Sequence, residues 1–228
     1  MGDGGRLDAP GGTPMNACVE SDLMRPAYWD DACADLMRAD RVMRKLIPEH
    51  QGARLLSRGD AFQTLARSVV GQQISVKAAQ SVWDRLLACV GRMTPNALLE
   101  QDIPALRAAG LSQRKCEYLR DLAGKFEAGD VHPRQWDTMS DEAIITELVA
   151  IRGIGRWTAE MFLIFHLMRP DVLPLDDIGL QRGISTRYFS GEAVSRSDLR
   201  EVAAAWAPWR SVGTWYIWRS LDPLPVEY

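Results

Sequence analysis

A glycine hairpin followed by a pair of aspartates is the part of this sequence best suited to chemistry. Gly153-Ile154-Gly155 separates two apolar segments, and Asp176-Asp177 lies beyond the second of them. Two glycines allow a tight turn and close approach from outside, and a helix that begins there presents its N–H groups and positive dipole end. The sequence therefore predicts a phosphate-binding turn next to a carboxylate.

Both features also have purely structural explanations. A Gly-x-Gly sequence suits an ordinary turn between two antiparallel helices, where glycine ends the first helix. Adjacent acids are common at helix starts, so Asp176 and Asp177 could simply cap a helix that begins at Ile178. The local sequence alone leaves these explanations open.

The elements that position these residues are all predicted to be helical. Apolar residues recur at helical spacing from Pro26 onward, and the segment from Trp157 to Met168 is apolar on nearly every side. Only Asp171 to Leu175 hints at extended chain. We therefore expect an all-α protein, whose last three helices span about residues 178–188, 197–206 and 208–221.

The composition is that of an ordinary globular protein. The chain has 228 residues, of which 46% are hydrophobic and 25% charged, and no apolar run is long enough to span a membrane. Residues 1–22 are rich in glycine and proline and lack a signal-peptide pattern, so we expect a disordered leader and a cytoplasmic protein. The cysteines form no CxxC pair, which argues against a zinc site, a disulfide framework or an iron–sulfur cluster: Cys18, Cys33, Cys89 and Cys116.

The charge distribution permits nucleic-acid binding without indicating it. The formal net charge is -3, whereas a general nucleic-acid binder is usually basic. Lys and Arg are concentrated between Arg38 and Arg58, and the segment from Arg182 to Arg219 is also net basic. Such runs are equally typical of solvated helix faces, so the decision rests on the motifs.

Several motifs in a fixed order resemble one family of DNA repair enzymes. The hairpin motif extends from Leu148 to Ala159, and Pro174-Leu175-Asp176-Asp177 follows it. Further matches are Val70-Gly71-Gln72-Gln73-Ile74-Ser75, Trp209-Arg210-Ser211 and Ile217-Trp218. Together they resemble the helix-hairpin-helix (HhH-GPD) superfamily of base-excision DNA glycosylases, and most closely its 3-methyladenine DNA glycosylase II group. The resemblance covers about residues 29–221.

This resemblance implies a glycosylase domain over residues 23–228 that consists of two helical lobes. Lobe one would comprise about residues 23–70 plus 176–228, and lobe two about residues 71–175, with a catalytic cleft between them. It also implies a monomer whose partner is damaged double-stranded DNA, located with genomic DNA in the cytoplasm and not at a membrane.

The resemblance assigns the catalytic role to Asp177 and leaves Asp176 as a helix cap. Family members that also cleave the DNA backbone carry a lysine where this chain has Trp157, and no lysine follows Lys125. The implied enzyme is therefore monofunctional. It would flip an alkylated purine of the 3-methyladenine or 7-methylguanine type out of the duplex, release it with water as nucleophile, and leave an abasic site.

The same resemblance implies the remaining site residues. The base pocket would contain Trp157, Met161, Trp215 and Trp218, and Met161 departs from the tyrosine of the best-known pocket. The duplex would contact Gln73, Ser75, Arg152, Gly153, Gly155, Arg156 and Thr158, with Gln73 filling the gap left by the flipped nucleotide. No cofactor is required, and a structural Na⁺ or K⁺ is implied at the main-chain carbonyls of Val149, Ile151 and Ile154.

Two other functions are compatible with the sequence. A glycosylase for deaminated, oxidised or mismatched bases would share the motifs but need to activate a neutral leaving group. A non-catalytic helix-hairpin-helix module would only grip duplex DNA, although Asp177 at the matching position argues against that alternative.

Overall fold

The structure is a computed structural model that describes residues 26–221, except 51, 53–54 and 56–59. The predicted leader, residues 1–22, lies outside the described residues. Within that part of the chain all regular elements are helices, which confirms the all-α prediction. They are α1 (Trp29–Ala39), α2 (Met43–Glu49), α3 (Ala61–Gly71), α4 (Val76–Val90), α5 (Pro95–Leu99), α6 (Ile103–Ala108), α7 (Gln113–Ala128), the 3-10 helix η2 (Pro133–Thr138), α8 (Asp141–Val149), α9 (Arg156–Phe165), α10 (Ile178–Tyr188), α11 (Arg196–Ala204) and α12 (Arg210–Arg219).

Polar residues with short side chains begin many of these helices. The Asp60 carboxylate accepts the Gln63 N–H, and the Ser75 hydroxyl accepts the Ala78 N–H. Such caps satisfy backbone donors that have no partner within the helix. Further side-chain caps are Thr94, Asp102, Ser112, Ser140, Asp177 and Ser195. Because caps are local, these helix starts could be predicted from the sequence.

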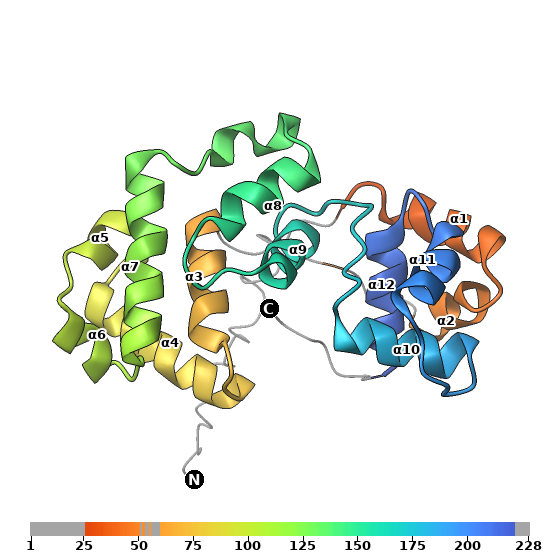
Figure 1. Cartoon of the computed structure of the whole chain (residues 1–228), viewed down its shortest axis with the longest axis horizontal. Coiled ribbons are helices and arrows are strands. Elements are labelled where there is room, and N and C mark those ends of the chain that lie inside the picture. Colours follow the sequence, from red (N-terminus) through yellow and green to blue (C-terminus); the bar gives the residue numbers. More distant parts are fainter. Residues whose placement is uncertain (1–25, 51, 53–54, 56–59, 222–228) are drawn as a thin grey trace, which may run out of the picture.

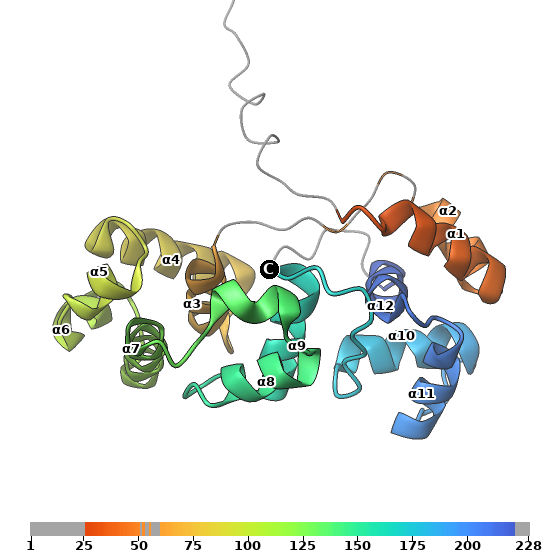
Figure 2. The same cartoon turned by 90° about the horizontal axis from the view of Figure 1, so that it is seen from above.

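The helices form two lobes (Figure 1). One contains α3 to α9, and the other combines α1 and α2 with α10, α11 and α12. Within the second lobe, α12 lies between the α1–α2 pair and the α10–α11 pair (Figure 2). The segment that was expected to be extended, Asp171 to Leu175, forms part of the irregular connection between the lobes.

The predicted boundary between the lobes at residue 70 is wrong, because it assigns α3 to lobe one. Helix α3 packs against α4, α7 and α9, all of which belong to the other lobe. Phe62 of α3 meets Phe126 of α7 edge to face, with ring centroids 5.3 Å apart. An amphipathic pattern identifies the buried side of α3 but not the helices that cover it.

A buried carboxylate joins the two ends of the chain within the second lobe. Asp40 is 7% exposed and ends α1, and its Oδ1 accepts the N–H groups of Val42 and Met43. Its Oδ2 accepts the Tyr188 hydroxyl at 2.9 Å and the Trp206 indole N–H at 3.3 Å. Since a buried charge is costly unless it is hydrogen-bonded, this set of donors fixes α1 and α2 against α10 and the end of α11.

In the described chain, no helix combines the length and the apolar character needed to cross a membrane.

Candidate active site

The backbone at the start of α10 fixes the position of Asp177. Asp177 is the N-cap residue, and its Oδ1 accepts the Leu180 N–H at 2.6 Å. Its own N–H donates to the Pro174 carbonyl at 3.0 Å. The capping role considered for Asp177 is therefore real, but it uses only part of the carboxylate.

Two tryptophans complete the environment of this carboxylate. Trp157 Nε1 donates to Asp177 Oδ2 at 2.9 Å, and Trp218 Nε1 donates to Oδ1 at 2.7 Å. Trp157 comes from α9 in one lobe and Trp218 from α12 in the other, so Asp177 lies where the lobes meet. The side chain is 8% exposed.

These partners orient the carboxylate without neutralising it. All three donors are neutral N–H groups, and no cation of the described residues forms an ion pair with Asp177. The arrangement is therefore suited to stabilising a positive charge that develops beside Asp177.

The aromatic walls of this site differ in exposure. Trp218 stacks on Phe165 of α9, with centroids 5.7 Å apart and planes inclined by 12°, so one face of its ring is occupied. Trp157 remains 38% exposed. Gly179 permits the close approach of Trp218, because a Cβ at that position would lie 3.1 Å from Trp218 Cδ1 and 3.1 Å from Asp177 Oδ1.

The expectation that Asp176 caps the helix is wrong. Asp177 occupies the N-cap position of α10, and the Asp176 side chain instead forms an ion pair with Arg196 at the start of α11. Its side chain is 52% exposed. The two adjacent carboxylates thus have different surroundings, one facing solvent and one enclosed between indoles.

The hairpin between α8 and α9 depends on a glycine with positive φ. Gly153 has φ +85°, and a Cβ there would lie 2.2 Å from the ring of Tyr118, so only glycine fits without rearrangement. Its carbonyl accepts the side-chain amide of Gln72 at 2.8 Å. This bond connects the hairpin to the turn between α3 and α4. Gly155 is the N-cap of α9 and has open space around it.

The two arginines predicted to contact DNA have carboxylate partners. Arg156 forms ion pairs with Glu142 of α8 and with Glu160 one turn further along α9. The hydrogen bond from Arg156 lowers the pKa of Glu142, whereas burial raises the pKa of Glu160. Arg152 lies 3.4 Å from Glu117. A DNA phosphate would have to compete with these carboxylates.

The other predicted site residues occupy varied positions. Gln73 is exposed, with φ 59°, at the tip of the turn between α3 and α4. Ser75 is exposed and caps α4, whereas Thr158 and Met161 are buried in α9. Trp215 is 5% exposed and meets the ring of Trp29 edge to face at 5.1 Å, the contact of a core residue.

The carbonyls expected to hold a monovalent cation lie at the end of α8 and in the hairpin. The Ile151 carbonyl accepts the Ile154 N–H at 3.1 Å, which leaves it a second lone pair. Val149 is the last residue of α8 and is 43% exposed. Neutral oxygen donors of this kind fit a hard cation such as Na⁺ or K⁺.

The sequence did not predict that several large hydrophobic side chains close in sequence to the site residues stay exposed. In the described chain these residues lie between α3 and α4, at the start of α4, at the end of α8, in the first turn of α9 and at the start of α10: Ile74, Val76, Val149, Trp157 and Ile178. Ile178 directly follows Asp177 and is 78% exposed. Its position next to Asp177 was the one available sequence signal. Helical periodicity does not reveal which apolar residues stay exposed.

Two cavities lie away from Asp177. One, of about 250 Å³, lies between α8, α9 and the connection to α10, and its charges are largely paired internally, as in Arg210–Asp171 at 2.6 Å and Arg156–Glu160 at 2.9 Å. The other, of about 330 Å³, lies between α2 and α10. Asp177 lines neither of them.

The chain matches a known protein family. The family model described as "HhH-GPD superfamily base excision DNA repair protein" matches residues 66–209, more than half of the chain. The chain belongs to the HhH-GPD superfamily. The match includes the Gln72 turn, the glycine hairpin and Asp177, so the family signature and the site geometry involve the same residues.

HhH-GPD relatives with similar sequences and structures are named 3-methyladenine glycosylases. The chain is 30% identical over 180 residues to DNA-3-methyladenine glycosylase 1 of Schizosaccharomyces pombe, covering 77% of this chain and 79% of that protein. A crystal structure of DNA-3-methyladenine glycosidase from Bacillus halodurans has a TM-score of 0.79 and 34% identity, covering 88% of this chain and 92% of that one. The S. pombe 3-methyladenine DNA glycosylase in complex with abasic DNA has a TM-score of 0.73 and 28% identity, covering 87% and 99%. The predicted family and its likeness to 3-methyladenine DNA glycosylases are confirmed.

Proposed function

We propose that this HhH-GPD protein is a monofunctional DNA glycosylase that releases alkylated purines, of the 3-methyladenine and 7-methylguanine type, and leaves an abasic site. The observation that carries the proposal is the Asp177 carboxylate, which three neutral N–H donors hold between the lobes and with which no cation of the described residues forms an ion pair. The names of its relatives, one of them bound to abasic DNA, support the same function.

The chemistry follows from the charge of the substrate. A purine alkylated on a ring nitrogen is cationic, so it departs with the bonding electrons of the glycosidic bond and needs little protonation. The sugar is left with positive charge at C1′, which an ionised Asp177 stabilises electrostatically. Water then adds to C1′, and its proton passes to Asp177 as general base and from there to solvent.

The tryptophans next to Asp177 favour a cationic base over a neutral one. Attraction between a cation and an indole face contributes about 0.5 to 2 kcal/mol, which a normal base does not gain. Trp157 has exposed surface available for this contact, and Trp218 has one face not covered by Phe165. Met161, a buried residue of α9, would affect the pocket through its packing against the core.

The proposal excludes a lyase step. A lyase of this family forms an imine through a lysine after the hairpin, where this chain has Trp157, and no lysine lies beyond Lys125. The indole N–H of Trp157 instead donates to Asp177. Strand cleavage at the abasic site is therefore not expected.

The DNA-binding part of the proposal uses both turns of the first lobe. Gln73, exposed at the tip of its turn, would occupy the gap left by the flipped nucleotide, next to the cap residue Ser75. The N-terminus of α9, with Gly153, Gly155 and Thr158, would bind a backbone phosphate, aided by Arg152 and Arg156. A Na⁺ or K⁺ on the carbonyls of Val149, Ile151 and Ile154 would add positive charge there. We further propose a monomer that acts on genomic DNA in the cytoplasm.

The decisive experiment compares Asp177→Asn with Asp176→Asn. The two substitutions make the same chemical change at adjacent positions, but only Asp177 is enclosed by the indoles. On methylated duplex DNA under single-turnover conditions, we expect release of 3-methyladenine and 7-methylguanine to fall by about a thousandfold in Asp177→Asn. The Asp176→Asn rate should stay within about threefold of wild type, since loss of an exposed ion pair is a small effect.

Two further measurements separate the alternatives. Release of uracil or 8-oxoguanine by wild type, without release of methylated purines, would replace the proposed substrate class. Binding to duplex DNA without release of any base would replace catalysis by a binding role. Equal release of methylated purines by Asp177→Asn and wild type would refute the catalytic assignment.

A further inference from the structure

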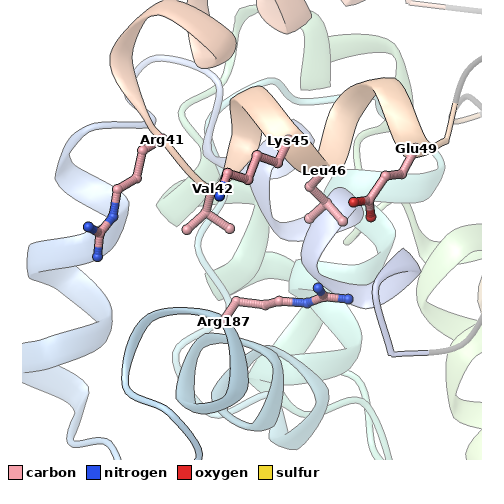
Figure 3. Close-up of a pocket in the computed structure, with 6 residues that line it drawn as sticks. All are labelled: Arg41, Val42, Lys45, Leu46, Glu49 and Arg187. Carbon is pink, nitrogen blue, oxygen red and sulfur yellow. The ribbon is translucent and has the colours of Figure 1, made fainter.

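The cavity between α2 and α10 lies on the lobe opposite the hairpin. It has a volume of about 330 Å³ and is lined by Arg41, Val42, Lys45, Leu46, Glu49 and Arg187. Figure 3 shows the side chains of α2 and the residues before it on one side, with Arg187 of α10 facing them. The cavity thus joins two elements that are distant in the chain.

The charges in this cavity are unbalanced. Three of its lining residues are cations and one is a carboxylate, Glu49. In the described part of the chain, neither Arg41 nor Lys45 forms an ion pair, and Arg187 donates only to the neutral Ser220 carbonyl, at 3.0 Å. Burial lowers the pKa of the nearby His50, Glu49 opposes this shift, and Arg219 and Arg187 add smaller lowering effects.

The cationic side chains that line the cavity suit a phosphate-like anion. A guanidinium presents parallel N–H donors that match phosphate oxygens, and a lysine adds a compact point charge. Val42 and Leu46 also line the cavity, and Leu46 is only 2% exposed, whereas Arg41, Lys45 and Arg187 are exposed. The other clusters of arginines, at the hairpin and around Asp171, already have carboxylate partners.

The cavity is connected to the candidate active site by a single helix. α10 begins directly after Asp177 and carries Arg187 in its last turn. In Figure 1, α10 and the turn between α3 and α4 lie along the same lower edge of the molecule, one on each lobe. A duplex placed with its lesion at Asp177 and its backbone at the hairpin can therefore extend along α10.

We propose that Arg41, Lys45 and Arg187 form a second phosphate-binding site, which holds a backbone phosphate of the duplex on the lobe opposite the hairpin. The proposal rests on the proposed function, because it assumes that DNA is engaged at Asp177. A soluble phosphate compound offers the same chemistry, so both sources are tested. Binding a phosphate on each lobe fixes the duplex across the junction where the base is flipped.

The test measures the affinity for a duplex with a non-cleavable abasic analogue by fluorescence anisotropy, over a series of KCl concentrations. The first variant is a double variant that combines Lys45→Gln with Arg187→Gln. The second is Arg187→Lys, which keeps the positive charge. Arg92→Gln removes an exposed arginine of the other lobe as a matched control. Each phosphate contact contributes about 0.9 to the slope of log Kd against log salt, so the double variant should lose about 1. Arg187→Lys and Arg92→Gln should keep the slope of wild type.

Glu49→Gln tests the same site in the opposite direction. Removing the one carboxylate should tighten binding of the duplex, because the cations then act unopposed. Unfolding temperatures are compared first, and since Lys45, Glu49 and Arg187 are exposed, all variants should fold.

A second arm titrates pyrophosphate into wild type and the double variant by calorimetry. A reduced salt slope in the double variant identifies the DNA backbone as the ligand. If the slope is unchanged, and wild type binds pyrophosphate but the double variant does not, the ligand of the site is a soluble phosphate compound. Unchanged slope and no such binding overturn the proposal. Base release by wild type is assayed separately, so that failure of the glycosylase function is not mistaken for failure of this site.

Discussion

Trp218 and Asp177 are joined by a hydrogen bond of 2.7 Å from the indole Nε1 to the carboxylate Oδ1, across 41 residues of sequence. The same oxygen accepts the Leu180 N–H, so the cap of α10 and the packing of α12 act on one atom. Trp157 holds the other oxygen from the opposite lobe. The direction of the candidate catalytic carboxylate therefore depends on how the lobes meet.

Trp218→Phe should slow base release without abolishing it. The phenyl ring can keep the stacking on Phe165, but the donor to Asp177 Oδ1 is lost. A hydrogen bond to a charged group contributes about 1.5 to 3 kcal/mol, so single-turnover release should fall by about 10- to 100-fold. Affinity for a duplex with an abasic analogue should change by less than about threefold, because the substitution acts through Asp177.

Trp209→Phe is the matched control for that experiment. Its indole also donates to a carboxylate, Asp35 at 2.9 Å, but within the α1 side of the second lobe. We expect it to lower stability slightly and to leave single-turnover release near the wild-type rate. Equal rates for Trp218→Phe and wild type would contradict a positioning role for Trp218.

Features of this site that depend on local sequence could be predicted, whereas contacts between distant helices could not. Asp177 and the glycine hairpin could be located from the sequence because their signals are local: a motif, a cap, a glycine pair. Trp157 and Trp218 were expected as faces for the base, but their N–H bonds to Asp177 depend on the packing of α9 and α12. The pairing of Arg156 with Glu142, across the hairpin, was not predictable for the same reason.

The fold shows the same division. Helix starts with polar caps have a local sequence signal, whereas the lobe to which α3 belongs does not, because periodicity indicates a buried face but not the helix that covers it. Asp176 illustrates a finer limit. Two adjacent acids were both compatible with capping, and only the backbone conformation decides that Asp177 caps while Asp176 reaches Arg196.

Gly153→Ala should destabilise the hairpin and weaken DNA binding. The residue has φ +85°, and the added Cβ would lie 2.2 Å from the Tyr118 ring, so both strain and steric overlap oppose alanine. We expect a loss of about 2 kcal/mol in the free energy of unfolding, which corresponds to a Tm lower by about 4 to 8 °C. Movement of the carbonyl that Gln72 binds should also lower affinity for DNA.

Gly155→Ala provides the internal comparison for stability. It lies two positions away, has no positive φ, and its Cβ would have nothing within 4 Å. Because glycine is only modestly favoured at an N-cap, the free energy of unfolding should change by less than about 1 kcal/mol. Similar Tm losses for both variants would show that Gly153 is not specifically required.

Glu142→Gln should strengthen binding to DNA by releasing Arg156. In the structure, Arg156 donates to Glu142 at 3.0 Å and to Glu160 at 2.9 Å, so its guanidinium is shared between two carboxylates. Loss of an exposed ion pair costs little stability. Without the Glu142 carboxylate, fewer negative charges compete with a phosphate for the Arg156 guanidinium. We expect affinity for duplex DNA to rise by about two- to fivefold at low salt, measured by anisotropy, and the gain to shrink at high salt.

The control for this prediction is Glu127→Gln, which removes another exposed carboxylate, near the end of α7. A long-range effect of net charge would appear equally in both variants. If Glu142→Gln binds no more tightly than Glu127→Gln, the competition between Glu142 and DNA for Arg156 is disproved.

Stability should fall below neutral pH through His166. Burial lowers the pKa of His166 below its usual value of 6.5, against a smaller opposing effect of Asp60, and its ring stacks on Phe162 with centroids 4.6 Å apart. The unfolded chain therefore takes up this proton more readily than the folded one. The contribution of neutral His166 is complete above about pH 6.5 and is lost as the pH falls from there toward the lower pKa of the folded state.

Urea unfolding of wild type and His166→Gln at pH 7.5 and 5.5 checks this sign. Glutamine cannot titrate but can still form a hydrogen bond with the Thr64 hydroxyl, which lies 3.2 Å from His166 Nδ1. We expect wild type to lose more stability between the two pH values than the variant does, since all other titrating groups are common to both. An equal or larger loss in His166→Gln would mean that the pH dependence arises elsewhere, because the only group removed is the imidazole between α3 and α9.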